Sequence, residues 1–419
     1  MKNALRRACA RIAEHEFWLV WVFGAPLLFA SNVPAWVFGA ALATIPFFWL
    51  ARKIARGHWS YPTPLDVPLV ILLGLGVVAV AVSNQRSVSL LLYGMLFGSI
   101  ALYYGVVNGL ARASIDKGVW LVLALGLGMA LVGLLGMNPA AKFFPAARLY
   151  DVLPRVNLDF LNARGFTPNI VAGAVAPVVP LAFALALARA GGARVLAMCV
   201  ACVMLLVVFV TQSRGAWLGL ACGFAVLGAW RFARVRWLLL LLVPVSIVLL
   251  AWLGPQTLTE ILLAGDAGGS SVSRAELWNR ALLMLRDFPF TGIGLGTFET
   301  NVQIFYPLFQ NLPGVPVPHA HNMYLQMGVD FGVGGVVAFV GLVITVLLSG
   351  LDVLRAPARE TRNWVGAGLV AGYVVYLAHG MLDAVAVSSK VSVVIWLMLA
   401  LMMILWRDDF AARANEATS

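Results

Sequence analysis

The chain has 419 residues, of which 62% are hydrophobic and only 11% are charged. A soluble domain carries roughly 25% charged residues, so this composition excludes an ordinary soluble protein and indicates a membrane protein. The formal net charge of +11 does not call for a nucleic-acid partner. Short basic segments between apolar runs explain most of it, and no clustered basic arm is present.

Apolar runs long enough to cross a bilayer recur along the chain. About 20 apolar residues cross roughly 30 Å of hydrocarbon, and backbone groups in lipid must be hydrogen-bonded internally. We therefore expect an all-α polytopic membrane protein with about twelve transmembrane helices, forming a single integral membrane domain over residues 1–419. The predicted spans are residues 17–31, 33–51, 67–83, 88–110, 119–137, 168–188, 195–212, 216–230, 237–253, 323–350, 364–387 and 390–406.

Lys and Arg are distributed unevenly between the two sides of these spans. Cytoplasmic loops retain positive charge during insertion, and a cytoplasmic N-terminus places most of the 29 basic residues on that side. We expect both termini in the cytoplasm. The two longest connections, residues 138–167 and 254–322, then lie on the far side of the membrane, and long loops commonly carry function.

Basic residues on the far side are candidates for binding an anion. The first long loop holds Lys142, Arg148, Arg155 and Arg164. Each alone suits a solvated charge or an anchor to anionic headgroups, whereas the set indicates an anion. Arg214 follows the seventh span after almost no loop, so its charge is expected at or just below the membrane surface. An ionisable group there is costly and indicates function, although a long side chain can also snorkel to the interface.

The stretch SVSRAELWNRALLMLRDFPF in the second long loop predicts a surface helix. Ser273 and Glu276 have the spacing of a capping box, which predicts a helix from Arg274 to about Asp287. Arg274 in the first turn opposes the helix dipole, which indicates either an exposed arginine with a small penalty or a bound phosphate. The apolar residues expected against the bundle are Leu277, Ala281, Leu282, Leu285 and Phe288.

Three alternating glycines, Gly292, Gly294 and Gly296, follow this helix. They lack a preceding strand and a complete G-x-G-x-x-G, so we reject a nucleotide-binding fingerprint. Glycine tolerates backbone conformations that other residues avoid, and we expect a tight turn that returns the chain to the membrane.

The stretch VPHAHNMYLQMGVDFGVGG places His319 and His321 at the far-side mouth of the tenth span. A neutral imidazole can remove a proton from a hydroxyl, and arginine binds phosphate oxygens bidentately. Together with Arg214 and Arg274, the histidines indicate transfer onto an alcohol from a diphosphate leaving group. Metal binding by His-Ala-His ranks lower, because no second cluster of carboxylates or cysteines is evident nearby. Without the arginines, the favoured interpretation would be that the two histidines lie at the membrane interface and have no functional role.

Span eleven contains two further ionisable residues in YLAHGMLDAV. His379 and Asp383 are four residues apart, so we expect them on one helical face near the far-side end of the span. There they could pair with each other and line a cavity.

These motifs resemble those of bacterial O-antigen ligases and of the superfamily shared with O-antigen polymerases and protein O-oligosaccharyltransferases. Arg214 to Leu218 is similar to the family's R-x3-L, and His321 to Gly335 is similar to its H-N-x9-G-x-x-G. The stretches RAELWNRALLMLRDFPFTGIGLGTF, GFTPNIVAG and HGMLD also resemble family segments. The motifs cover roughly residues 164 to 384, and the layout of spans extends the resemblance over the chain.

The resemblance implies a GT-C-like fold and an inverting glycosyltransferase that needs no metal, ATP or other cofactor. Its donor would be a glycan on undecaprenyl diphosphate, and its acceptor the lipid A core oligosaccharide, on the periplasmic side of the bacterial inner membrane. By motif, His321 would be the general base, and Arg214 and Arg274 would hold the donor diphosphate. The candidate accessory residues are His319, Asn322, Arg164, His379 and Asp383.

Two other functions stay open from the sequence. A polymerase of the same superfamily would use a second lipid-linked glycan as acceptor, although the H-N-x9-G-x-x-G form favours a ligase. A twelve-span transporter commonly has two similar six-span halves with polar groups near the midplane. Here the long loops follow spans five and nine and the charges cluster at the far-side edge, so transport ranks behind catalysis.

Overall fold

The computed structural model describes residues 2–29, 32–110, 114–137, 156, 166–241, 244, 248, 251–252, 270–309, 317–355, 360–385 and 387–418. All regular secondary structure in these residues is helical, which confirms the predicted all-α class. The elements are α1 (Lys2–Glu14), α2 (Glu16–Leu28), α3 (Ala35–Arg56), α4 (Asp66–Val82), α5 (Arg86–Gly109), α6 (Ile115–Gly136), α8 (Pro168–Val175), η3 (Ala176–Val178), α9 (Val179–Ala188), α10 (Gly191–Val210), α11 (Arg214–Arg231), α13 (Ser270–Asp287), α14 (Phe298–Ile304), α15 (Met323–Arg355), α16 (Glu360–Gly380), η4 (Lys390–Ser392) and α17 (Val393–Thr418).

Six helical segments in the described part of the chain are long and apolar enough to cross a membrane. They are Ala35–Arg56, Arg86–Gly109, Ile115–Gly136, Pro168–Ala188, Gly191–Val210 and Met323–Arg355. Two further apolar helices, α2 and α4, are shorter, with 13 and 17 residues. Eight of the 17 residues of the predicted span 237–253 lie outside the described residues. The six segments support a polytopic membrane protein, while twelve spans, periplasmic loops and orientation stay predictions.

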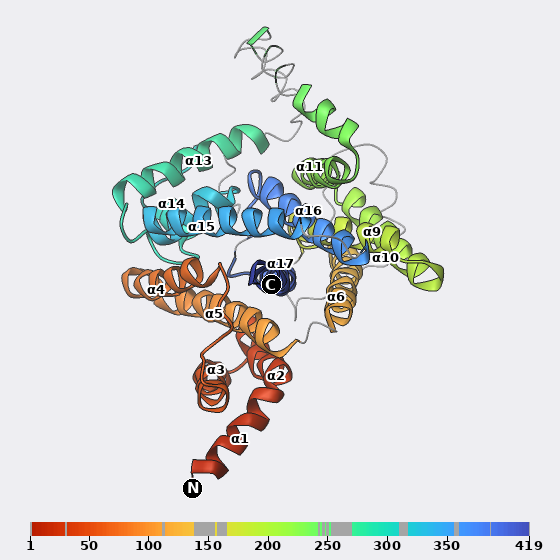
Figure 1. Ribbon diagram of the computed structural model, residues 1–419. Helices are drawn as coiled ribbons and strands as arrows, with labels where there is room; N and C mark the ends of the chain where they lie inside the picture. Colours follow the sequence, from red (N-terminus) through yellow and green to blue (C-terminus); the bar gives the residue numbers. More distant parts are fainter. Residues whose placement is uncertain are drawn as a thin grey trace.

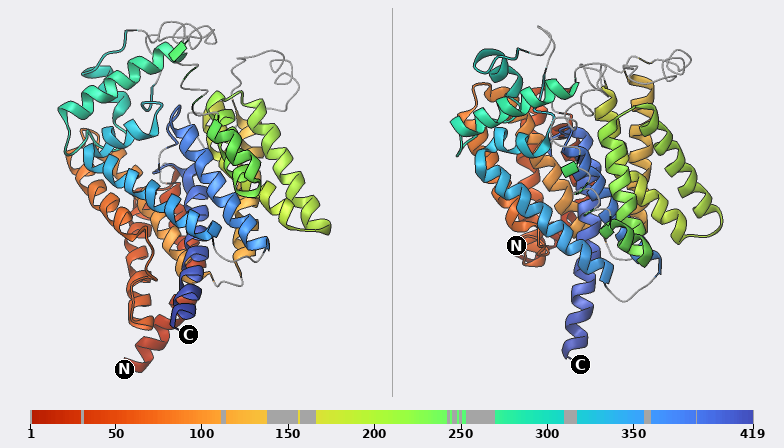
Figure 2. Two further views of the ribbon diagram at one scale, coloured as in Figure 1. Left: turned by 45° about the horizontal axis from the view of Figure 1, so that its top comes forward. Right: turned by 90° about the horizontal axis from the view of Figure 1, so that it is seen from above.

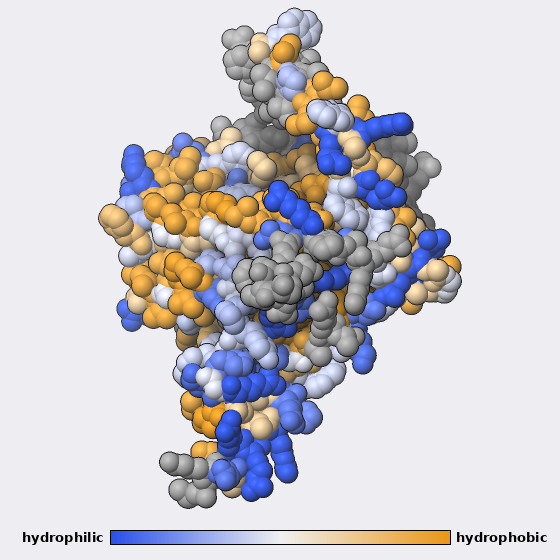
Figure 3. Space-filling view, in the orientation of Figure 1, coloured by the Kyte–Doolittle hydropathy of each residue, from blue (hydrophilic) through white to orange (hydrophobic). Residues whose placement is uncertain are grey.

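The surface of the bundle is apolar where helices would face lipid. On α10, Val195, Leu206 and Phe209 are 61%, 60% and 65% exposed. Hydrophobic side chains also gather over α4 and α15 on the face shown in Figure 3, whereas hydrophilic ones surround α1. Large exposed apolar surfaces are rare on soluble monomers, so this surface agrees with insertion in a bilayer.

The bundle surrounds α17, which passes through its middle between α5, α6, α15 and α16 (Figure 1). Trp396, Leu401 and Met403 of α17 are at most 2% exposed. Both chain termini lie toward the end of the bundle opposite α13 (Figure 2). We refer to these as the terminal end and the α13 end.

The surface helix α13 begins earlier than its sequence predicts. It runs from Ser270 to Asp287, so the predicted end is correct but the start at Arg274 is wrong by four residues. Ser273, the expected cap, lies inside the helix, because the serine-rich segment before it is itself helical. Arg274 is therefore in the second turn. The helix dipole acts mainly within the first turn, so the predicted unfavourable interaction between the dipole and the charge of Arg274 is absent.

The buried face of α13 is narrower than predicted and packs on α15. Leu277, Ala281 and Met284 are at most 1% exposed, at the i, i+4 and i+7 spacing of one helical stripe. Leu282 and Phe288, which were expected on this face, are 53% and 46% exposed. These two residues lie off the buried stripe, because consecutive residues of a helix are about 100° apart and the neighbours of α13 cover only the face of Leu277, Ala281 and Met284.

The glycine-rich segment after α13 forms the predicted tight turn. Gly292, Gly294 and Gly296 have φ values of 63°, 99° and 70°, a left-handed region that other residues rarely adopt. A Cβ atom on Gly294 would lie 2.7 Å from that of Ser83, so the turn also packs closely on α4 and its C-terminal cap. We call residues 292–296 the glycine turn.

The glycine turn and α15 meet backbone to backbone at a kink. Gly332 interrupts α15 with φ 71° and ψ −166°. A Cβ atom there would lie 2.5 Å from the carbonyl oxygen of Pro289. The amide of Val333 donates to Pro289 at 2.7 Å, and the amide of Ile293 donates to the carbonyl of Val329 at 2.8 Å. The first glycine of the G-x-x-G motif is therefore needed for this close approach.

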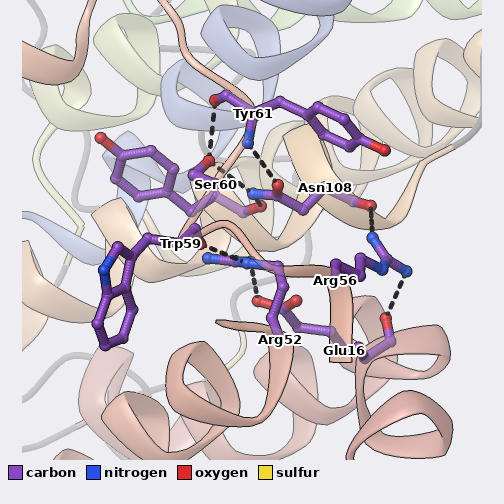
Figure 4. A network of polar contacts seen from close by, with 9 residues as sticks. Glu16, Arg52, Arg56, Trp59, Ser60, Tyr61 and Asn108 are labelled. Carbon is purple, nitrogen blue, oxygen red and sulfur yellow. Dashed lines mark hydrogen bonds and ion pairs between the residues drawn. The ribbon is translucent and has the colours of Figure 1, made fainter. Parts of the chain in front are cut away.

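A polar network connects α2, α3, α5 and the α3–α4 connection at the terminal end (Figure 4). Arg52 and Glu16 form an ion pair in which the side chains are 2% and 0% exposed. Arg52 also donates to the carbonyl of Trp59. Arg56 donates to the carbonyl of Asn108 at 3.1 Å, and the side chain of Asn108 makes three more hydrogen bonds. We call these residues the Arg52 network.

Candidate functional site

Two histidines and one aspartate converge where α15 begins. Nδ1 of His321 lies 3.1 Å from Oδ1 of Asp383, and Nε2 of His319 lies 3.7 Å from the same oxygen. The two imidazole rings are 4.4 Å apart and nearly perpendicular. We call these three residues the histidine–aspartate cluster.

Hydrogen-bond directions define the roles of the ring nitrogens. An ionised carboxylate only accepts, so Nδ1 of His321 carries the proton and Nε2 keeps its lone pair. Nδ1 of His319 accepts from the backbone amide of His321 at 3.2 Å, which leaves its Nε2–H facing Asp383. Burial lowers the pKa of His319 to about 4, and the charge of Asp383 offsets only part of this effect. His319 is therefore neutral at neutral pH.

The backbone of His321 is in the left-handed region, with φ 49°. This conformation is uncommon for a residue with a side chain, and it costs on the order of 1–3 kcal/mol unless its surroundings enforce it. Ala320 provides one anchor, because it is fully buried and its amide donates to Oε1 of Gln326 at 2.9 Å. The segment therefore holds one histidine on each side of a fixed, buried residue.

Asn322 has a clear structural role. Its Oδ1 accepts from the amides of Tyr324 and Leu325, at 3.0 Å each, as the side chain of a helix cap does. Its Nδ2 donates to the carbonyl of Met381 at 3.1 Å. Asn322 therefore starts α15 and ties it to the segment that carries Asp383.

Two supporting residues were not singled out in the sequence. Nε2 of Gln326 donates to Asp330 at 2.9 Å, and Asp330 accepts from the amide of Gly296 at 3.3 Å. Through the bond to Ala320, this chain connects the histidines to the glycine turn. The available signal was a pair of polar residues four apart in the otherwise apolar start of the span.

The side chains of His379 and Asp383, which could pair according to the sequence, form no hydrogen bond with each other, whereas the amide of Asp383 donates to the carbonyl of His379 at 3.1 Å. Because α16 ends at Gly380, Asp383 is outside the helix and the i, i+4 rule does not apply to it. The ring of His379 lies between two helices, 2.8 Å from a Cβ position on Gly173 of α8 and 3.5 Å from one on Gly215 of α11. Its Nε2 is buried, with no hydrogen-bond partner among the described residues.

The two predicted diphosphate-binding arginines approach His379 from different helices. Arg214 is the half-buried first residue of α11, directly before the glycine that packs on His379. The charge of Arg274, half-buried on α13, reaches His379 electrostatically. His379 therefore links the two arginines to the segment that carries Asp383, whose amide donates to the carbonyl of His379 at 3.1 Å. Arg164 lies outside the described residues.

The cluster can act in two chemical ways. A histidine oriented by a carboxylate and left with a free ring nitrogen is the arrangement of a general base. The same three residues offer ligand atoms within 4.8 Å of one another, which is close enough to hold a metal ion. The sequence shows no second cluster of carboxylates or cysteines near the histidines, and the structure adds one carboxylate, that of Asp383, from 62 residues further along the chain.

An apolar cavity of about 350 Å³ lies between α2, α6 and α8. Its lining includes Trp21, Leu28, Met129 and Ile170. The helix α8 also carries Gly173, against which His379 packs. The cavity can therefore accommodate an apolar chain beside the helix that supports the site.

Residues 197–340 match the model of a protein family described as O-antigen ligase. The matched segment runs from α10 into α15 and contains Arg214, Arg274 and His321, whereas His379 and Asp383 lie beyond it. A search of curated proteins finds no match to the chain.

Proposed function

Because the chain is a member of the O-antigen ligase-type superfamily, we propose that it transfers a glycan from undecaprenyl diphosphate to a hydroxyl of the lipid A core oligosaccharide. Family membership implies glycosyltransferase-like activity in lipopolysaccharide biosynthesis, with a lipid-linked glycan as substrate in a membrane. The finer proposal is that the α13 end faces the periplasm of a bacterial inner membrane. Both termini would then be cytoplasmic, which agrees with their common position at the opposite end.

The observation that carries this proposal is the 3.1 Å contact between Nδ1 of His321 and Asp383. It orients the ring and leaves Nε2 as the proton acceptor. In the proposed step, Nε2 takes the proton of the acceptor hydroxyl while the hydroxyl oxygen attacks the anomeric carbon of the glycan. The bond from that carbon to the diphosphate oxygen breaks on the opposite face, so the configuration inverts.

Arg214 and Arg274 would bind the diphosphate. A guanidinium stays charged and matches phosphate oxygens bidentately, so it stabilises both the bound donor and the charge that develops on the leaving group. Both substrates are lipids in one membrane, and cleavage of the bond between the glycan and the diphosphate supplies the driving force without ATP. The apolar cavity beside α8 would hold part of the isoprenoid chain.

The test is a transfer reaction with purified full-length protein. Undecaprenyl-diphosphate glycan and rough lipopolysaccharide are mixed without ATP or added metal, and glycan attachment is followed as a shift in gel mobility. We expect a shift with wild type and its loss with His321→Ala. His15→Ala is the matched control, because His15 is an exposed histidine between α1 and α2.

Two outcomes would change the proposal. Elongation of the lipid-linked glycan without attachment to lipopolysaccharide would make the chain a polymerase of the same superfamily. Full transfer by His321→Ala would remove His321 as the base. A separate binding measurement tests the arginines, since tight retention of the donor by Arg214→Ala would contradict its assignment to the diphosphate.

A further inference from the structure

We propose that the histidine–aspartate cluster is also a binding site for a zinc-class divalent cation, and that the bound ion inhibits transfer. The binding stands on the geometry of His319, His321 and Asp383 alone. The inhibition rests on the function proposed above, because it acts on the nitrogen assigned as the base.

The separations between the three side chains suit a zinc ion. Zinc binds histidine nitrogen at about 2.0–2.1 Å and carboxylate oxygen at about 2.0–2.2 Å, so two ligands of a tetrahedral ion are about 3.4 Å apart. Oδ1 of Asp383 is 3.1 Å from the nitrogen of His321 and 3.7 Å from that of His319. All three ligand atoms lie within 4.8 Å of one another. The two N–O separations differ from the tetrahedral spacing by a few tenths of an ångström, and the two histidine nitrogens would have to close from a separation of at most 4.8 Å, which would complete three ligands and leave a fourth position open.

The ligands are accessible and held in place. The side chains of His321, His319 and Asp383 are 30%, 19% and 6% exposed, so an ion can reach them from solvent. Ala320 anchors the segment between the histidines, and the amide of Ala384 donates to Oδ1 of Asp383 at 2.8 Å. Two imidazoles with one carboxylate form a ligand set that zinc and similar divalent ions accept.

Metal binding would break hydrogen bonds that the histidines form in the metal-free cluster. If Nε2 of His319 binds the ion, its proton must move to Nδ1, which now accepts from the amide of His321. That bond, 3.2 Å long, is at the weak end of the usual range. This bond and the bond from Nδ1 of His321 to Asp383 are both lost against three bonds to the metal, so the affinity decreases but binding is not prevented.

Inhibition follows from the position of the proton on His321. In the form active as a base, Nδ1 donates to Asp383 and Nε2 has the lone pair. An ion on Nδ1 displaces that proton, and the neutral ring then carries its proton on Nε2. The ion therefore removes the lone pair that would accept the proton of the sugar hydroxyl. The metal-bound and base-competent forms of His321 exclude each other.

The site is tested by titrating the purified full-length protein with Co²⁺, which replaces zinc and gives visible absorption bands. Cys199 and Cys202, exposed on α10, are replaced by serine throughout, so that thiols do not bind the ion. The protein is purified with a tag that contains no histidine, so that the tag does not bind the ion. We expect a saturable spectrum of a four- or five-coordinate ion at one equivalent, which Zn²⁺ abolishes.

Variants assign the signal to the cluster. His319→Gln keeps a side chain that can accept from the amide of His321 but removes the imidazole ligand, and Asp383→Asn removes the carboxylate. Losing a residue that only hydrogen-bonds to a metal ligand reduces metal affinity roughly 10–100-fold. Losing one of the ligands themselves should reduce the affinity for Co²⁺ by more than that. His15→Ala should bind as the parent does. An unchanged spectrum in His319→Gln and Asp383→Asn, or binding only at millimolar Co²⁺, would overturn the site.

A second measurement separates this site from the proposed function. Transfer is followed with and without Zn²⁺, and we expect inhibition that chelator reverses in the parent and that weakens in His319→Gln. The readout is the ratio of the two rates within each variant. A cobalt spectrum that depends on the cluster in a protein without transfer activity would support the site and contradict the function. Transfer that is unaffected by Zn²⁺ at saturating occupancy would contradict the inhibition.

Discussion

The two ends of the bundle use buried polar groups differently. At the terminal end, the Arg52 network connects side chains mainly to backbone carbonyls and to one buried counter-ion, across α2, α3 and α5 (Figure 4). At the α13 end, Asp383 is shared by two histidines, His321 has a left-handed backbone, and Nε2 of His379 is buried with no hydrogen bond among the described residues. The first arrangement joins three helices through an ion pair and backbone carbonyls, and of the Glu16 carboxylate only Oε2 is buried without a hydrogen bond in the described part of the chain. The second arrangement orients ionisable side chains around a shared carboxylate and a strained backbone.

This difference indicates which property each end supports. Satisfied buried networks contribute to stability, and removing one member leaves a buried group uncompensated. Unusual backbone conformations and unsatisfied groups cluster at functional sites. We therefore expect changes at the α13 end to reduce activity more than stability, and changes in the Arg52 network to do the opposite.

The sharpest test of the comparison is His321→Ala. Loss of a general base reduces a rate by about 10²–10⁴-fold, and His321 is partly exposed, so the fold should survive. We expect the transfer rate to fall by that factor with a melting temperature close to that of wild type. Transfer assays and thermal unfolding in the same detergent measure both quantities. A large loss of melting temperature would mean that this end is structural too.

Arg52→Met tests the terminal end. It leaves Glu16 buried without its counter-ion, which costs about 3–5 kcal/mol of unfolding free energy. The double variant Glu16→Leu, Arg52→Met should recover most of this loss, because it removes both charges. Denaturant unfolding measures the stability, and transfer per folded molecule should stay unchanged. Equal stability of Arg52→Met and wild type would show that the ion pair is not required.

Gly332→Ala tests the backbone contact between the glycine turn and α15. Alanine is strained at φ 71°, and its Cβ would be 2.5 Å from the carbonyl of Pro289, so we expect a loss of about 1–3 kcal/mol. Activity should fall as well, because the turn supports the histidine segment through Asp330. Gly341→Ala on the same helix is the control, since a Cβ there meets nothing within 4 Å. Equal effects of the two substitutions would contradict the structural role of the motif.

Asn322→Ala should have the smallest effect of this series. It removes the helix cap and the bond to Met381, at a cost of about 0.5–2 kcal/mol. Asn322→Asp keeps a capping oxygen and should retain most of the stability in thermal unfolding. If Asn322→Ala reduced transfer as strongly as His321→Ala without loss of stability, Asn322 would contact substrate instead of capping α15.

The sequence by itself determined the lipid environment, the fold class and the set of candidate site residues. Apolar runs in a chain with few charges require helices, because lipid offers no partner for backbone groups. Three local features were also readable, since each depends on neighbours in the chain: the position of Arg214 at the short connection between two helices, the end of α13 at Asp287 and the turn through Gly292. Local chemistry decides such features.

Only the tertiary structure decided which of these residues meet. Asp383 was predicted with His379 because helical spacing suggested it, but the helix ends first and the carboxylate joins His321, 62 residues away. The need for Gly332 is likewise visible only from the carbonyl of Pro289 that approaches it. Such contacts depend on how distant segments pack, and one sequence does not specify the partner of a polar group that turns away from its own helix.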